Sequence, residues 1–82
     1  MANEIKILCP SRKCGKCRRM VARVEEALNL SGIQTEIQII DSIEEMMQYP
    51  TWILPTLVIN GNIVAKGYIP SVQNIQEYLT NN

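Results

Sequence analysis

Two cysteines separated by two residues are the part of this sequence best suited to covalent chemistry. Cys14 and Cys17 enclose Gly15 and Lys16. On a helix this spacing places two side chains one turn apart, with about 5 to 6 Å between their β-carbons, and modest adjustment then brings the sulfur atoms within bonding distance. The pair can therefore form and open a disulfide, which is the chemistry of thiol–disulfide exchange.

The expected positions of the two cysteines suggest different chemical roles for their thiols. Cys14 is predicted to stand at a helix N-terminus, where unpaired N–H groups and the positive end of the helix dipole favour the thiolate. We therefore assign the attack on a substrate disulfide to Cys14. Cys17 is predicted to face the protein interior and to resolve the mixed disulfide. Lys13 and Lys16 are expected to favour the thiolate further.

The third cysteine, Cys9, ends a predicted core strand. We interpret it as a small buried apolar residue, and a third redox or metal-binding thiol is the alternative. Six of the 8 cations of the chain gather around the other two cysteines. Three of them, Arg18, Arg19 and Arg23, are interpreted as a solvated helix surface, with recognition of an acidic partner as the alternative.

The composition predicts one small domain, residues 1–82, because a chain of 82 residues that is 46% apolar has material for a single core. Its 8 cations and 8 anions leave no excess charge for general nucleic-acid binding. No apolar run approaches membrane-spanning length, and the first residues lack the features of a secretory signal. An odd number of cysteines, two of them close together, fits thiols of a reducing compartment. We therefore expect a monomeric cytoplasmic protein that binds neither nucleic acid nor membrane.

Apolar periodicity predicts the elements that hold the cysteine pair. Residues 5–8 are apolar apart from Lys6 and predict a first strand. From 14 to 30, apolar side chains recur at three- and four-residue intervals, which predicts a helix with one buried side; residues 29–32 are expected to close it. Strict alternation over 33–39 predicts an edge strand with one buried face.

The second half of the chain predicts a hairpin between two helices. Ser42 has the spacing of a capping box with the glutamate three residues later, so a short helix is expected there, stopped by Pro50. Residues 56–59 are apolar or β-branched throughout, which predicts a strand covered on both faces. Asn60-Gly61 suits a type I′ turn into an antiparallel partner strand, and Ser71 is expected to cap a last helix.

The predicted order is β-α-β-α-β-β-α, an α/β fold with a four-stranded mixed sheet flanked by helices. The first strand, helix and second strand form a right-handed parallel crossover, and the later hairpin adds antiparallel strands. This order places Cys14 in the loop after the first strand, where a helix N-terminus meets the carboxyl edge of the sheet.

Two motifs carry a resemblance to a known family. They are the run Cys14-Gly15-Lys16-Cys17 and the segment 54–61, Leu-Pro-Thr-Leu-Val-Ile-Asn-Gly, and the similarity continues to Ser71. With these motifs the sequence resembles the small thioredoxin-like, glutaredoxin-sized redox-active disulfide proteins of bacteria and archaea. The resemblance implies a thioredoxin-like fold and a thiol–disulfide oxidoreductase of electron transport and cell redox homeostasis, with no cofactor and no metal. The implied partners are a disulfide-containing protein or small molecule as substrate and an unidentified reductase.

The same resemblance assigns residues before the third strand to substrate binding. It implies that the bond before Pro55 is cis, that Pro55 packs beside the cysteines, and that the backbone of Leu54 pairs with an incoming peptide. It also brings Trp52 near the cysteines. Taken alone, these residues allow an ordinary trans proline at a strand start and a tryptophan packed in the core. Gly67 is expected either to allow close backbone approach beside the site or to end a strand.

Two other functions would use the same cysteines. A copper or zinc carrier also binds soft metals through Cys-x-x-Cys, but its fold has a hairpin between the second and third strands, where this sequence predicts a helix. A closed zinc site needs four ligands, whereas the chain has 3 cysteines and no histidine, so a site shared between molecules or completed by a carboxylate remains as the metal-binding alternative. A redox-sensing binding module shares every residue with the exchange hypothesis, and turnover of a disulfide substrate distinguishes the two.

Overall fold

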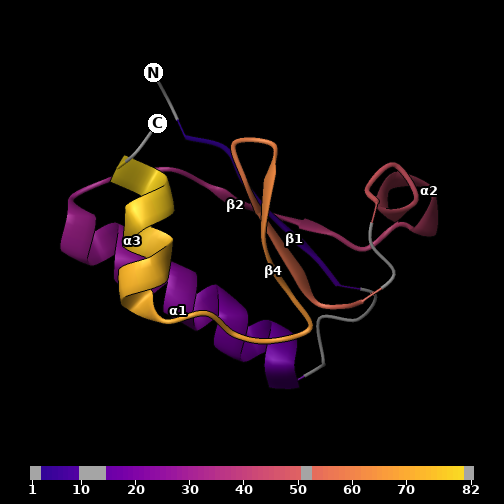
Figure 1. The fold of residues 1–82 in the computed structure, drawn as a ribbon, viewed down its shortest axis with the longest axis horizontal. Coiled ribbons are helices and arrows are strands. Elements are labelled where there is room, and N and C mark those ends of the chain that lie inside the picture. The colour runs from indigo at the N-terminus through magenta and orange to yellow at the C-terminus, as the bar shows by residue number, and fades with distance from the viewer. Residues whose placement is uncertain (1–2, 10–14, 51–52, 81–82) are drawn as a thin grey trace.

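The computed structural model describes residues 3–9, 15–50 and 53–80, and these residues form strands and helices in the predicted order (Figure 1). The elements are β1 (Ile5–Leu8), α1 (Gly15–Ser31), β2 (Ile37–Ile40), α2 (Ile43–Met46), β3 (Thr56–Ile59), β4 (Asn62–Lys66) and α3 (Val72–Thr80). Within the same residues, no helix has both the length and the apolar character needed to cross a membrane.

The described strands form one mixed sheet in the order β2-β1-β3-β4, which confirms the predicted arrangement with β2 at an edge. β1 lies parallel to β2, with Ile5 opposite Ile37, and antiparallel to β3, with Ile5 opposite Ile59. Parallel neighbours need a crossover connection, and α1 supplies it. β3 turns into β4 at Asn60 and Gly61, whose φ angles are 52° and 82°. These positive angles are those of the predicted type I′ turn.

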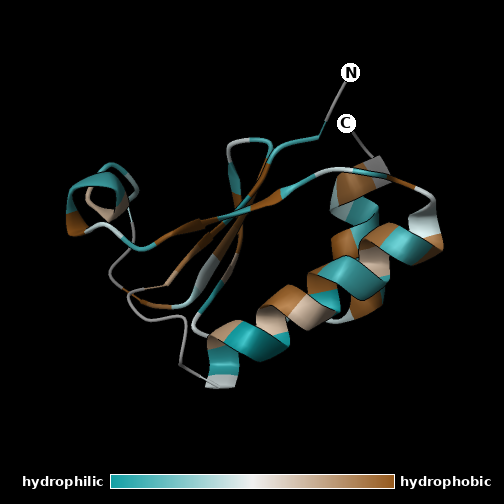
Figure 2. Cartoon of the chain, turned by 180° about the vertical axis from the view of Figure 1, so that it is seen from behind, coloured by the Kyte–Doolittle hydropathy of each residue, from teal (hydrophilic) through white to brown (hydrophobic). Residues whose placement is uncertain are grey.

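Helices cover both faces of the sheet, because the side chains of each central strand alternate between two apolar clusters. Ile7 of β1 and Leu57 of β3 belong to the cluster of α1 and α3. The next residues along the same strands, Leu8 and Val58, pack with Met46 of α2. All residues of β3 are buried, as predicted for a strand covered on both faces. Figure 2 shows hydrophobic and hydrophilic bands along α1 and α3, as expected of helices with one buried side.

The first helix ends as predicted at Gly32. The Gly32 N–H donates to the Asn29 carbonyl at 3.3 Å, and the Ile33 N–H donates to the Leu28 carbonyl at 3.0 Å. These are the two hydrogen bonds of a Schellman cap, which satisfies the last carbonyls of a helix. The chain therefore leaves α1 in a defined direction toward β2.

The two later helices differ in how they begin. The Ser71 hydroxyl accepts the Asn74 N–H at 3.2 Å, so the predicted cap of α3 is confirmed. Ser42 precedes α2, but its side chain makes no capping hydrogen bond, and the predicted capping box is wrong. α2 is a single turn of 4 residues whose first N–H groups lie near solvent, so water can take the place of a side-chain cap. It ends at Met46, well before Pro50.

β2 is shorter than predicted and ends one residue later. The exposure of side chains alternates from Ile33 onward, but pairing with β1 begins only at Ile37, because β1 itself begins at the residue opposite. Before that point the Thr35 hydroxyl donates to the Asn3 carbonyl at 2.7 Å. The last residue of the strand, Ile40, packs on the α2 side of the sheet.

Candidate active site

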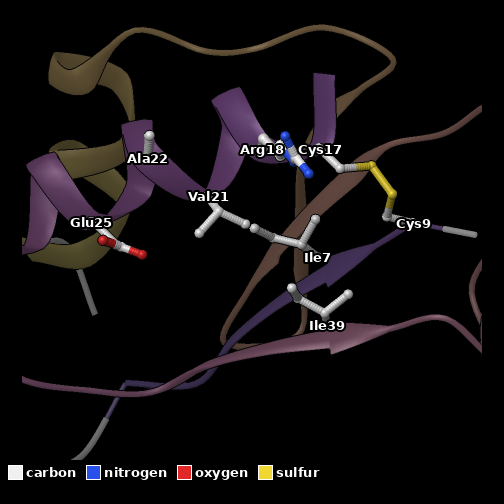
Figure 3. A pocket seen from close by; sticks show the side chains of 8 residues that line it. All are labelled: Ile7, Cys9, Cys17, Arg18, Val21, Ala22, Glu25 and Ile39. Carbon is white, nitrogen blue, oxygen red and sulfur yellow. A yellow bond between two sulfur atoms is a disulfide. The ribbon is translucent and has the colours of Figure 1, made fainter. Parts of the chain in front are cut away.

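A disulfide between Cys9 and Cys17 marks the candidate site (Figure 3). Their α-carbons are 6.4 Å apart, and the two residues are 8 positions apart in the sequence. Cysteines at such a separation can bond without movement of the backbone. Cys9 is fully buried and Cys17 is 4% exposed. The bond joins the end of β1 to the first turn of α1, within the apolar cluster between the sheet and this helix.

Strand geometry explains why the Cys9 side chain faces α1. Side chains alternate along a strand, so Cys9 continues the face of Ile5 and Ile7, which packs with α1 and α3. The Cys9 N–H donates to the Ile40 carbonyl at 3.0 Å, which extends the pairing with β2 one residue beyond β1. The sheet therefore holds the backbone at Cys9.

Helix geometry brings Cys17 to the same place. The buried residues of α1 are Cys17, Met20, Val24, Ala27 and Leu28, and their spacing puts them on one side of the helix. Cys17 is the first of them and lies in the first turn, where free N–H groups and the helix dipole favour a thiolate. This turn contains no acidic residue that would oppose the anion.

The disulfide corrects the interpretation of Cys9. Its burial agrees with the prediction, but it is bonded to Cys17 and is therefore more than a small apolar residue of the core. The signal that could have revealed the pair is the alternation of β1, which carries Cys9 onto the face that α1 covers. The inward orientation predicted for Cys17 is confirmed. Cys14, Lys13 and Trp52 lie outside the described residues, and the roles assigned to them stay predictions.

Hydrogen bonds tie the first turn of α1 to the loop before β3. The Lys16 ammonium donates to the Gly67 carbonyl at 3.3 Å, and the Gly67 N–H donates to the Pro55 carbonyl at 2.8 Å. The Leu54–Pro55 bond is cis, the geometry that the family resemblance implies. Pro55 is buried, whereas Leu54 is 36% exposed. The residue before Cys17 is thus connected through Gly67 to the segment expected to bind peptides.

Other cations of α1 also bind backbone carbonyls. The Arg19 Nε donates to the Gly15 carbonyl at 3.3 Å within the helix, and a guanidinium nitrogen of Arg23 donates to the Pro70 carbonyl at 3.2 Å. Arg18 and Arg19 are exposed, as expected of a solvated surface. Arg23 is half-buried and joins α1 to the segment before α3, so for this residue that interpretation is wrong.

Gly67 allows close packing beside the loop. Its φ is 74°, in the left-handed region where a side chain is strained. A Cβ at this position would also collide with the Cγ2 atom of Ile53. The Thr56 hydroxyl donates to the Ile53 carbonyl within the same loop. Gly67 therefore does more than end a strand, because it lets the end of β4 approach the loop around Pro55.

An apolar pocket of about 330 Å³ opens beside the disulfide (Figure 3). Both cysteines form part of its wall, and the remaining lining comes from the sheet and α1: Ile7, Arg18, Val21, Ala22, Glu25 and Ile39. Figure 3 shows Ile7 and Ile39 on the strands, facing Val21 on the helix. The sulfur atoms are nearly covered by protein, yet they border a space large enough for a small thiol.

Comparison with known proteins agrees with this fold. A family model described as the thioredoxin domain matches residues 3–80. The chain is also 32% identical over 66 residues to a thioredoxin of Methanocaldococcus jannaschii, and the aligned part spans 80% of this chain and 76% of that protein. The similarity thus covers both the cysteine-bearing helix and the segment around Pro55. The chain therefore belongs to the thioredoxin family of thiol–disulfide oxidoreductases.

Proposed function

We propose that the chain passes electrons from a reductase to disulfides of protein or small-molecule substrates, with Cys14 as the attacking thiol and Cys17 as the resolving thiol. The observation that supports this proposal is the state of Cys17, which lies in the first turn of α1, faces inward and takes part in a disulfide. A sulfur held there can make and release an S–S bond while the helix stays folded. Cys14 directly precedes Gly15, the first residue of that helix.

The proposed cycle uses these two thiols, the substrate disulfide and a dithiol reductase. The Cys14 thiolate attacks one sulfur of the substrate disulfide, so a mixed disulfide forms and the other substrate sulfur leaves as a thiolate. The Cys17 thiolate then attacks the Cys14 sulfur and releases the second substrate thiol. Two electrons have passed to the substrate, and the enzyme holds a Cys14–Cys17 disulfide. A dithiol reductase returns two electrons to the enzyme by the same kind of exchange. We propose the cytoplasm as the compartment in which the chain works.

The proposed substrate surface is the loop that contains the cis bond. Leu54, Ile53 and Tyr68 have apolar side chains that are 36%, 54% and 55% exposed. Among the described residues, no backbone hydrogen bond uses the N–H or C=O of Leu54. An extended substrate segment can form hydrogen bonds with the backbone N–H and C=O of Leu54, as an added strand does. Its side chains would then contact Ile53 and Tyr68. Trp52, the sequence neighbour of Ile53, is included in this proposal.

Catalysed reduction of a protein disulfide tests the proposal. The full chain is expected to speed the reduction of insulin by a dithiol, and Cys14→Ser is expected to lower the rate to the uncatalysed level. Cys17→Ser keeps the attacking thiol but lacks the resolving one, so it should accumulate a mixed disulfide with insulin that a dithiol releases. Trapping by Cys14→Ser instead would invert the two roles. Oxidation of the chain without turnover of insulin would favour a redox-sensing module.

A further inference from the structure

We propose that Cys9 is a third exchange thiol, which competes with Cys14 for the sulfur of Cys17 and moves the disulfide of the oxidised protein into the core. The inference rests on the proposed function for the role of Cys14, and on the Cys9–Cys17 bond for the second pairing. Three features of the molecule support it: the anchoring of the two bonded residues, the sharing of one sulfur, and the burial of Cys9 in an apolar cluster.

The backbone holds Cys9 and Cys17 within bonding range from both sides. Cys9 is fixed to β2 by the hydrogen bond from its N–H to the Ile40 carbonyl. Cys17 is part of α1, and the preceding Lys16 donates to the Gly67 carbonyl. Both bonded residues thus lie in or beside regular structure, so opening and closing the bond requires rotation of side chains rather than rearrangement of a loop.

One sulfur can bond only one partner, so the pairings of Cys17 with Cys9 and with Cys14 exclude each other. Starting from a Cys14–Cys17 disulfide, the Cys9 thiolate attacks the Cys17 sulfur. A Cys9–Cys17 bond forms, the Cys14–Cys17 bond breaks, and Cys14 leaves as a thiolate that takes up the proton lost by Cys9. No electron enters or leaves the protein, and no oxidant or reductant is needed.

Burial favours the pairing of Cys17 with Cys9. Cys9 is fully buried in an apolar cluster, where a thiolate is poorly solvated but a disulfide carries no charge. Cys14 precedes the N-terminus of α1, which stabilises a thiolate. Release of Cys14 as the leaving thiolate is therefore favoured over release of Cys9. The oxidised protein thus stores its disulfide as Cys9–Cys17 and keeps Cys14 reduced.

This stored disulfide changes what the enzyme can do. Cys14 can still attack a substrate, but Cys17 is not available to resolve the mixed disulfide. The chain then holds the substrate until a reductant opens the buried bond. Both sulfur atoms are almost completely covered, and the apolar pocket at the bond is the space from which a small thiol can reach them.

Disulfide mapping in the full chain tests the exchange. The reduced protein is oxidised with diamide or with oxidised glutathione, free thiols are blocked with iodoacetamide, and the peptides are identified by mass spectrometry. Trypsin cleaves after Arg12, Lys13 and Lys16, so each of the 3 cysteines falls in its own peptide. We expect the blocked thiol mainly at Cys14, a smaller share at Cys9, and the same ratio from both oxidants. A Cys14–Cys17 disulfide alone from both oxidants, or a ratio set by the oxidant, would overturn the exchange.

The Cys14→Ser variant separates this inference from the proposed function. Only Cys9 and Cys17 remain, and mild oxidation should lower the free thiols from two to none, reversibly with a dithiol. Cys9→Ala is the matched control and should hold only Cys14–Cys17 after oxidation. If Cys14→Ser keeps both thiols, the role of Cys9 is refuted while the insulin assay stands. If the wild-type chain fails to turn over insulin but Cys14→Ser closes its disulfide, the proposed function falls and the Cys9 pairing remains.

Discussion

At Gly67, a single residue connects three parts of the candidate site. Its N–H bonds the Pro55 carbonyl, its carbonyl accepts the Lys16 ammonium, and the Ile53 side chain fills the space where a Cβ would lie. Gly61 has a similar φ of 82°, but apart from its two chain neighbours no atom of the described residues lies within 4 Å of its Cβ position. The two glycines therefore allow the cost of the backbone conformation to be separated from the cost of the contact.

Gly67→Ala is expected to lower the free energy of unfolding more than Gly61→Ala. The change at Gly61 adds the strain of a left-handed backbone, about 1 to 2 kcal/mol, whereas the change at Gly67 adds this strain and the collision with Ile53. Urea denaturation measures both. Ile53→Ala in the Gly67→Ala background should recover the difference, because Ile53 is 54% exposed and little is lost by shortening it. An equal decrease in the free energy of unfolding at the two glycines would show that the Ile53 side chain moves aside without destabilising the fold.

Among the elements, α2 and α3 each follow a serine, but the two serines differ in what their side chains do. The Ser71 hydroxyl caps α3, a helix of 9 residues that places Ile75 and Leu79 in the cluster shared with α1 and β1. Ser42 makes no side-chain cap, and the helix it precedes has 4 residues. Fraying of α3 would therefore expose core side chains close to the cysteine-bearing helix.

Ser71→Ala is expected to lower the free energy of unfolding by about 1 kcal/mol, the usual cost of losing a helix N-cap. Ser42→Ala is the matched control, because it makes the same chemical change at a helix start without removing a capping hydrogen bond. Its effect should be close to zero. Urea denaturation of the two variants compares them directly, and a loss at Ser42 as large as that at Ser71 would contradict the assignment of the caps.

For the molecule as a whole, apolar periodicity predicts the element order and the mixed sheet, because every strand and helix must bury one face or two. It does not predict where pairing starts: Thr35 has the alternation of a strand, but β1 offers no backbone partner there. The Cys9–Cys17 bond depends on one face of β1 meeting one face of α1. The apolar repeat of the strand and the apolar repeat of the helix each give one of these faces, but neither repeat shows that the two faces meet. The cis bond before Pro55 follows only from the family resemblance, because most X-Pro bonds are trans.

The disulfide between β1 and α1 also links the redox state of the molecule to its stability. The bond closes a loop between residues 8 positions apart, which restricts the unfolded chain and stabilises the folded one by about 2 to 3 kcal/mol on a loop-entropy estimate. Because the bond stabilises the folded chain, folding must stabilise the bond by the same free energy, so the bond is harder to reduce in the folded chain than in the unfolded chain. This coupling favours the closed Cys9–Cys17 bond over its two free thiols in the folded chain.

The Cys14→Ser variant isolates this coupling, because Cys9–Cys17 is the one disulfide that its two remaining cysteines can form within the chain. Its oxidised form is expected to unfold with a free energy about 2 to 3 kcal/mol higher than its reduced form, measured in urea at one pH with and without a dithiol. A variant that carries Cys9→Ala as well has no pair to close and should unfold alike in both conditions, which controls for effects of the dithiol itself. If oxidised and reduced Cys14→Ser unfold at the same urea concentration, the buried bond adds nothing to the stability of the fold, and the coupling between redox state and stability is refuted.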